Sequence, residues 1–392
     1  MVPTVKTLRV KEQHIAVFGR SGSGKTVLVS SFYGGAQEPH FLQESLFHVL
    51  ADDISLGNRL RQNYLGMRNA GQVPQQTRFA ATPYSFTVKL KDNRESKNTK
   101  AKPFDALRLV WHDYPGEWFE EEPSSTEESN RRLDTFRALL KSDVALVLVD
   151  GQKLLDYAGE EEKYLKELFW GLRDGLLRLR EDLLVDGKRL TTFPRVWVLG
   201  LSKADVLPHL DAQGFGDLVI EKAAAEVAQL HEVLMSLVKA PRALSIGEDF
   251  MLLSSAKFEP GRIEVTQRVG VDLLLPVAAL LPLERFVQWA RVGENPRKLL
   301  DGLVENSDSL VRTLTESKFL GDLLGSVPRI GPLLNATARP ALAAALRYGG
   351  AKVKALNVES RAKGDYATAA LTQFKLDLDG AVEQGTLVKS LR

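Results

Sequence analysis

The sequence predicts an α/β fold: a doubly wound, mostly parallel sheet with an appended helical C-terminal region. Through the first two thirds of the 392 residues, short β-rich apolar runs alternate with longer helical patterns, which is typical of parallel strands joined by crossover helices. The first run is followed by a glycine-rich turn, GRSGSGKT, and then by a helix start. From about Glu294 the strand signals end, and apolar residues three and four positions apart indicate helices.

Six apolar runs carry the strand signal. Two of them, YSFTVKL and ALRLVWHD, enclose a charged, proline-containing stretch at 91–105, which predicts an exposed hairpin loop and one antiparallel pair. Helical spacing is clearest at 160–184, 218–238 and 283–290. The expected strands are 14–19, 84–90, 106–113, 144–150, 195–201 and 250–255.

We expect two regions, 1–293 and 294–392, with a soft boundary near Gly293 to Pro296. The stretch 37–76 is long for a connection within the first region, and its helical spacing predicts an inserted helix rather than a bare loop. This insertion could serve ordinary packing or a partner surface, and both readings stay open.

Composition excludes several classes of function. The chain has no cysteine, which excludes disulfides, thiolate zinc sites and thiol catalysis. Its formal net charge is +2, so no nucleic-acid partner is expected. Residues 1–10 lack the apolar centre of a secretory signal, and the longest uncharged apolar run, Leu273 to Leu283, is too short to cross a bilayer. We therefore expect a cytoplasmic protein, with peripheral membrane association as an option.

The turn from Gly19 to Thr26 fits the pattern G-x-x-x-x-G-K-[ST] between a strand and a helix. Glycines let successive main-chain N–H groups point inward and approach phosphate oxygens, and the helix N-terminus adds partial positive charge. Lys25 would reach the β- and γ-phosphates, and Thr26 would ligate Mg²⁺. The segment therefore predicts a site for the phosphates of a nucleotide.

The sequence DYPG follows the third expected strand. Asp113, at the strand's carboxyl end, could hold Mg²⁺ through water, and Gly116 could offer its N–H to a γ-phosphate. Alone this pattern is often a plain turn. Because DYPG lies one hairpin after the phosphate loop, a role in nucleotide binding is favoured over a plain turn.

Two further tetrapeptides, SKAD at 202–205 and SSAK at 254–257, each follow an expected strand. The Asp205 carboxylate can accept hydrogen bonds from N1–H and the 2-amino group of guanine, whereas adenine offers neither, so Asp205 favours guanine and disfavours ATP. Lys203 could lay its aliphatic stem along the base with its ammonium on the loop backbone, and the Ala256 N–H could meet guanine O6. Each tetrapeptide alone is more often an ordinary loop, but ligands bind at the carboxyl ends of such strands.

Together, GRSGSGKT, DYPG, SKAD and SSAK resemble the G1, G3, G4 and G5 elements of the P-loop GTPases of the translation-factor-related (TRAFAC) class, over roughly Leu8 to Ala290. The longer string DYPGEW is similar to that of the YcjX-like bacterial GTPases. The resemblance implies a P-loop GTPase fold, Mg²⁺-dependent binding of GTP and GDP, slow hydrolysis and switch segments. It assigns nucleotide contacts to Gly19, Arg20, Ser21, Gly22, Ser23, Gly24, Lys25, Thr26, Val27, Ser202, Lys203, Asp205, Ser255, Ala256 and Lys257.

The family's G2 element is a threonine that completes the Mg²⁺ and γ-phosphate shell. We prefer Thr77 over Thr82, because Pro83 holds Thr82 extended near the strand. The expected metal ligands are then Thr26, Asp113 and Thr77, and the expected catalytic groups are Lys25, Gly116, Glu117 and Thr77.

Departures from the family concern hydrolysis. Glu117 stands where many small GTPases carry a water-orienting glutamine, and its negative charge beside the phosphates predicts slow hydrolysis or dependence on a partner's cation. Arg20 could reach a γ-phosphate or simply face solvent. Gly22 stands where potassium-activated relatives carry asparagine, so potassium activation is not expected. The acidic stretch 117–129, with Trp118 and Phe119, resembles a mobile second switch or a plain solvated face.

The stretch 318–354 carries six basic residues and one aspartate, a net charge of +5. It could lie on an anionic membrane or pack as a helical hairpin on the first region. Two functions remain: a GTP-hydrolysing switch or remodelling factor, or a GTP-binding interaction module with little turnover. A protein partner or homodimer is expected in either case.

Overall fold

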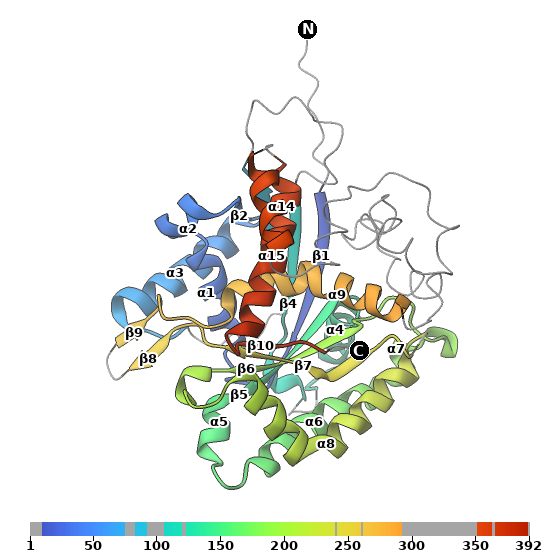
Figure 1. Cartoon of the computed structure of the whole chain (residues 1–392). Helices are drawn as coiled ribbons and strands as arrows, with labels where there is room; N and C mark the ends of the chain where they lie inside the picture. Colours follow the sequence, from blue (N-terminus) through green and yellow to red (C-terminus); the bar gives the residue numbers. More distant parts are fainter. Residues whose placement is uncertain are drawn as a thin grey trace, which may run out of the picture.

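The computed structural model describes residues 10–74, 83–91, 106–119, 123–239, 241–259, 262–291, 351–362 and 365–390. In this part of the chain, eight strands form one sheet in the order β10-β7-β6-β5-β1-β4-β3-β2 (Figure 1). The five strands from β7 to β4 pair in parallel, and antiparallel pairs add β3 and β2 at one edge and β10 at the other. The strands are β1 Val10–Phe18, β2 Phe47–Ala51, β3 Tyr84–Leu90, β4 Ala106–His112, β5 Val144–Asp150, β6 Val196–Ser202, β7 Ser245–Leu253 and β10 Leu387–Val388.

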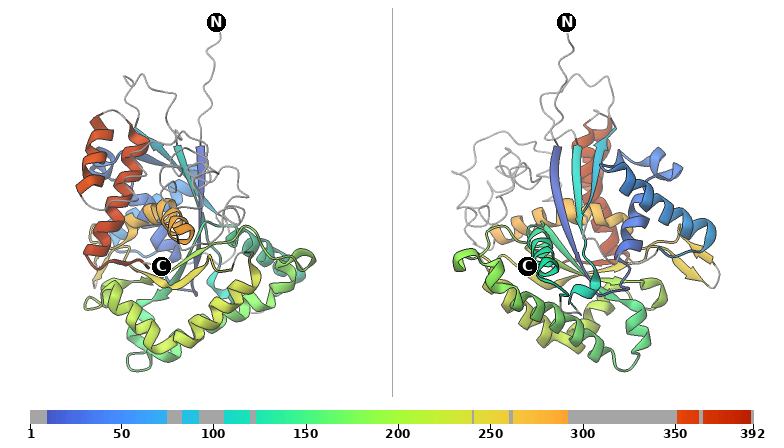
Figure 2. Two further views of the ribbon diagram at one scale, coloured as in Figure 1. Left: turned by 45° about the vertical axis from the view of Figure 1, so that its right-hand side comes forward. Right: turned by 180° about the vertical axis from the view of Figure 1, so that it is seen from behind.

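Helices cover both faces of this sheet (Figure 2). One face carries α1, α9 and α15, and the other carries α4, α6 and α8. A short hairpin, β8 Lys257–Glu259 and β9 Arg262–Glu264, projects after β7. The main helices are α1 Lys25–Gly35, α2 Pro39–Glu44, α3 Ile54–Ala70, α4 Thr126–Leu139, α5 Gly151–Asp156, α6 Glu161–Arg178, α7 Arg180–Leu183, α8 Ala212–Leu237, α9 Leu274–Arg291, α14 Ala351–Ala362 and α15 Tyr366–Glu383.

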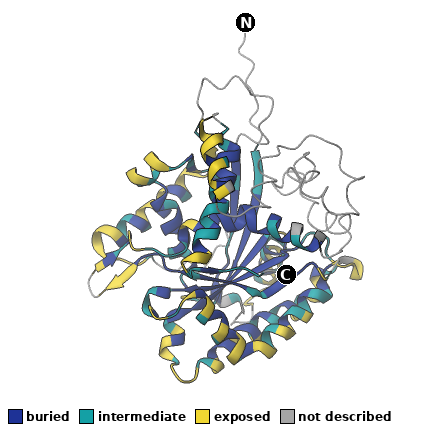
Figure 3. Cartoon of the chain, viewed as in Figure 1, coloured by how far each residue is buried: buried dark blue, intermediate teal, exposed yellow. Residues whose placement is uncertain are grey.

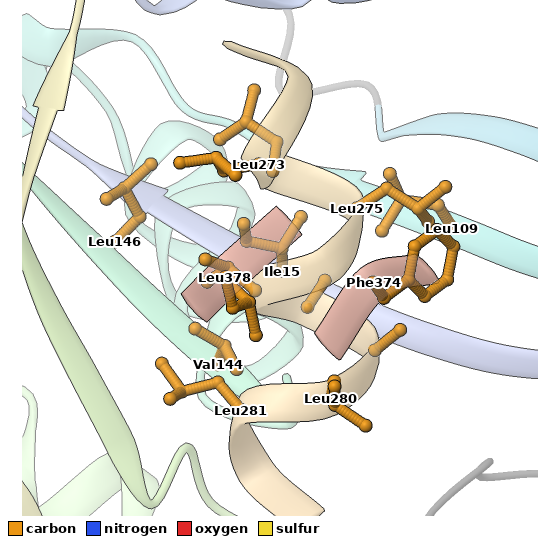
Figure 4. Packing of buried hydrophobic residues seen from close by; sticks show 14 of the residues in the cluster. Ile15, Leu109, Val144, Leu146, Leu273, Leu275, Leu280, Leu281, Phe374 and Leu378 are labelled. Atoms are coloured by element: carbon orange, nitrogen blue, oxygen red, sulfur yellow. The ribbon is translucent and has the colours of Figure 1, made fainter. Parts of the chain in front are cut away.

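The core follows from the alternation of side chains along buried parallel strands. In β1, Ile15 and Val17 join the apolar cluster under α9 and α15, whereas Ala16 and Phe18 join the cluster under α6 and α8. Figure 3 shows the central strands of the sheet buried and the outer faces of the helices exposed. In the first cluster, Ile15 of β1 lies beside Leu378 of α15, and Val144 of β5 lies beside Leu281 of α9 (Figure 4).

The six predicted strands are confirmed as β1, β3, β4, β5, β6 and β7, with ends that differ by a few residues. The predicted antiparallel pair is β3 with β4, in which Tyr84 lies opposite Trp111. The loop that joins them lies outside the described residues at 92–105. The doubly wound, mostly parallel sheet is therefore observed as predicted.

The stretch 37–76 contains more than the predicted inserted helix. Its helices are α2 and α3, but between them Phe47–Ala51 forms the edge strand β2, antiparallel to β3. The sequence did not predict this strand, because a run of five residues is too short to show the period of a strand within a stretch of helical spacing. The main-chain donors and acceptors of β3 decide the conformation of this run, and they come from a distant part of the sequence.

The C-terminal part is helical in α14 and α15, but it also contributes β10, which the sequence did not indicate. Leu387 and Val388 pair with Met251 and Phe250 of β7. A strand of two residues shows no hydrophobic period, so it can be recognised only from its pairing with β7. The expected boundary at 293–296 lies outside the described residues.

Helix α9 begins nine residues before the predicted helical spacing at 283–290. Pro276 lies in its first turn, where the missing N–H leaves no hydrogen bond unmade, and Pro282 lies inside it. Among the described residues, no helix is both long and apolar enough to cross a membrane. Most of the basic stretch 318–354 lies outside the described residues, which resume at Ala351.

Candidate functional site

The predicted motifs meet at one cavity, of about 470 Å³, at the carboxyl ends of the parallel strands. Because these ends share one edge of the sheet, residues far apart in the sequence line the same space. The predicted residues at the cavity are Ser21, Gly22, Ser23, Gly24, Lys25, Thr26, Val27, Asp113, Gly116, Ser202, Lys203, Asp205 and Ser255.

The phosphate loop has the backbone that its glycines predict. Gly22 and Gly24 have φ values of 80° and 88°, in the left-handed region that favours glycine, and open space lies where a Cβ would stand. Helix α1 begins at Lys25 and has no acidic residue in its first turn. No carboxylate of the helix itself therefore offsets the partial positive charge at its N-terminus.

The ammonium of Lys25 is held at the loop by main-chain oxygens. It donates to the carbonyl oxygen of Gly19 at 2.7 Å and to that of Arg20 at 3.3 Å, and the side chain is buried. A buried cation so placed strengthens the positive potential at the end of the cavity where the glycines lie.

The DYPG turn lies against the phosphate loop. A Cβ on Gly116 would stand 2.2 Å from the main-chain nitrogen of Ser21, so only glycine allows this approach. Desolvation raises the pKa of Asp113 to about 6, although the Lys25 ammonium opposes the rise.

At the far end of the cavity, Lys203 takes a left-handed backbone conformation with a φ of 54°. Its ammonium donates to Asp150 Oδ2 at 2.7 Å, and not to the loop backbone as expected. Asp150 ends β5 directly beside Ser202, the end of β6, so sheet register brings this carboxylate to the lysine. The other oxygen of Asp150 accepts from Gln152 N–H and caps α5.

Asp205 is connected to the SSAK loop. Ser254 Oγ can donate to Asp205 Oδ1 at 2.7 Å or to the carbonyl oxygen of Ala256 at 2.6 Å. The Phe258 N–H donates to Asp205 Oδ2 at 3.2 Å. The Ser31 hydroxyl of α1 donates to the carbonyl oxygen of Ser255 at 2.7 Å, which links this loop to the helix of the phosphate loop.

Some predicted residues lie away from the cavity. Arg20 lies beside a smaller cavity behind the loop, with its guanidinium 3.6 Å from Glu167 of α6. Ala256 is fully buried, and the half-exposed Lys257 pairs with Glu259 at 2.8 Å. Thr77 and its alternative Thr82 lie outside the described residues.

The segment after Gly116 is a single 3-10 turn, Gly116–Phe119, which contains Glu117. Arg132 of α4 donates to the carbonyl oxygen of Trp118 at 3.1 Å, and its guanidinium lies 5.7 Å from the centre of the indole ring. The same arginine pairs with Glu128 at 2.6 Å. The 3-10 turn is thus attached to α4 through one buried cation.

The sequence reasoning missed several residues of the site. Asp150 could have been found, because VLVDG places a carboxylate directly at the end of a strongly apolar strand. The others carry no local signal, since Val73, Pro74, Tyr84, Gln152 and Phe258 line the cavity only through the fold.

One family model covers the phosphate loop, DYPG and SKAD. The family model described as Double-GTPase 2 matches residues 13–243. None of the curated proteins matches the chain. Among solved structures, the chain is 18% identical to the signal recognition particle receptor SRb-GTP/SRX complex from Chaetomium thermophilum, over 65% of this chain and 94% of that one, with a TM-score of 0.30. It is 14% identical to a variant of Era from Aquifex aeolicus bound to GDP and AlF4⁻, over 73% of this chain and 70% of that one, with a TM-score of 0.26.

Proposed function

Because this chain belongs to the Double-GTPase 2 family and so binds guanine nucleotide, we propose that it hydrolyses GTP to GDP and phosphate with Mg²⁺ and acts as a nucleotide-dependent switch or remodelling factor. One observation supports this most strongly: a single cavity has the glycine loop and Lys25 at one end and Asp205 at the other. The arrangement suits a nucleotide whose phosphates and base are recognised separately.

At the phosphate end, main-chain N–H groups from Ser21 to Thr26 would bind the β-phosphate, and Lys25 would bind the β- and γ-phosphates. The hydroxyl of Thr26 and the carboxylate of Asp113 would hold Mg²⁺, with Thr77 as the proposed third ligand. The described residues contain no group of three or more His, Asp or Glu side chains that could hold a metal. Most ligands of the ion would therefore be phosphate oxygens and water, as Mg²⁺ prefers.

Bound Mg²⁺ would neutralise charge that develops on the phosphoryl oxygens. Lys25 and the Gly116 N–H would stabilise the same charge, and water would attack in line with the leaving oxygen. Glu117 follows Gly116 and is the proposed water-positioning group. Its negative charge makes slow turnover the expectation, with a protein partner or a second copy of the chain supplying a cation.

At the base end, the Asp205 carboxylate would accept from N1–H and the 2-amino group of guanine. A carboxylate has about four acceptor positions, so it can keep the Ser254 and Phe258 donors and still receive the base. The Lys203 stem would lie along the base while Asp150 fixes its ammonium.

A calorimetric titration with GTP, GDP and ATP, each with Mg²⁺, tests the binding part of this proposal. Binding of both guanine nucleotides with much weaker binding of ATP is expected. Phosphate release is then measured against Lys25→Ala. Turnover above that control supports hydrolysis, whereas tight binding without phosphate release favours the alternative, an interaction module that recruits a protein or membrane partner. No binding of guanine nucleotides would overturn both.

A further inference from the structure

The structure points to Tyr114, the second residue of DYPG, as a positioning residue. We propose that its side chain docks the DYPG turn on the phosphate loop, and so contributes to the preference for GTP over GDP. This inference rests on the proposed function and concerns the same site.

The hydroxyl of Tyr114 binds both polar main-chain groups of one loop residue. The Gly19 N–H donates to Tyr114 Oη at 3.0 Å, and Tyr114 Oη donates to the carbonyl oxygen of Gly19 at 3.3 Å. The side chain is buried, with 4% of its surface exposed. Buried polar groups cost free energy when unpaired, so the contact holds both partners in place.

The ring of Tyr114 is fixed from three sides. The Lys25 ammonium lies 5.1 Å from the ring centre while it donates to the same Gly19 carbonyl. The rings of Phe18 and Phe136 pack against it with centres 6.0 Å and 5.6 Å away. Tyr114 therefore joins the end of β1, the phosphate-loop lysine and helix α4 in one contact.

The docking of Tyr114 also constrains Gly116, two residues further along the chain. Its Cα lies so close to Ser21 that no Cβ fits between them. With Tyr114 fixed on Gly19 and Gly116 against Ser21, the turn is docked at both of these points. The Gly116 main chain is thus held beside the loop, where its N–H would serve a third phosphate. Preorganisation of this kind favours the ligand that uses the donor, which is GTP and not GDP.

The test compares two tyrosines. Tyr114→Phe removes only the hydroxyl and keeps the ring. Tyr164→Phe is the matched control, because Tyr164 is equally buried and its hydroxyl accepts from the Asp150 N–H at 2.8 Å, on another strand end. Affinities for GDP and for a non-hydrolysable GTP analogue are measured with Mg²⁺, and thermal unfolding is followed for both variants.

Tyr114→Phe removes both hydrogen bonds to Gly19, but the Gly19 carbonyl keeps the Lys25 donor. We therefore expect the preference for the GTP analogue over GDP to fall by about fivefold, the usual effect of one neutral hydrogen bond. Tyr164→Phe should change both affinities alike. Hydrogen exchange of the nucleotide-free proteins should be faster at 113–119 in Tyr114→Phe alone.

An unchanged preference and unchanged exchange in folded Tyr114→Phe would overturn the positioning role while the wild-type protein still binds GTP. Wild-type protein that binds neither nucleotide would instead overturn the proposed function and this inference together.

Discussion

At the phosphate end of the cavity, contacts come from the main chain and one lysine of a single short segment, Gly19 to Thr26, with the DYPG turn docked against it. At the base end they come from side chains on three strand ends: Asp150 at the end of β5, Lys203 and Asp205 after β6, and Ser254 in the loop after β7. The first end depends on backbone conformation and the second on partners about fifty residues apart. Side-chain substitutions should therefore affect the two ends by different amounts and in different ways.

The largest effect is expected from Lys25→Ala, which removes the positive charge that would face the phosphates. Loss of a buried cation that would face two phosphates should weaken GTP binding or turnover by about a hundredfold or more. Titration and phosphate release measure it. Lys153→Ala, an exposed lysine on α5, is the control and should change neither. If the two variants bound and hydrolysed GTP equally well, Lys25 would have no role in binding phosphates.

Asp205→Asn should change which base the protein prefers rather than abolish nucleotide binding. An amide offers a donor that suits the 2-oxo group of xanthine, and it loses an acceptor for the 2-amino group of guanine. We expect about a hundredfold loss of GTP affinity with a gain for xanthosine triphosphate. Competition titrations measure both. An unaltered base preference would contradict the assignment of the base end.

A smaller and more uniform loss is expected from Asp150→Asn. The Lys203 ammonium loses its ion pair while the helix cap remains, because asparagine also caps helices. GTP and GDP should both bind about fivefold more weakly, since one charge-assisted contact is lost away from the phosphates. Asp53→Asn, at the exposed cap of α3, is the matched control. A change in the ratio of the GTP and GDP affinities would show that the two ends are coupled.

Ser254→Ala should have the smallest effect. It removes a hydroxyl that contacts either Asp205 or Ala256, and the Phe258 N–H still holds the carboxylate. The preference for GTP over ATP should fall by about threefold. Titrations with GTP and with ATP measure this preference. An effect as large as that of Asp205→Asn would show that Ser254 itself contacts the base.

The comparison of the two ends also explains how far sequence reasoning went. GRSGSGKT could be interpreted from eight adjacent residues because its chemistry is local: glycine permits left-handed backbone, and a helix must follow. The central strands were predicted for the same reason, since buried parallel strands are continuous apolar runs. SKAD and SSAK were found by their places after strands, although their mutual contacts were not.

Elements that depend on a distant partner were missed or misread. The strand β2 exists because β3 offers it a free edge, and β10 exists because β7 does. The ammonium of Lys203 was placed on the wrong partner, because only sheet register sets Asp150 beside Ser202.

By itself, then, the sequence determined the doubly wound sheet, the phosphate loop and the order of the motifs along the chain, because each arises from the conformational preferences and hydrophobic pattern of neighbouring residues. Tertiary structure alone decided which carboxylate holds Lys203, which hydroxyl reaches Asp205 and how Tyr114 docks the turn on Gly19. Those contacts join atoms separated by tens of residues, and no local preference specifies a distance in space.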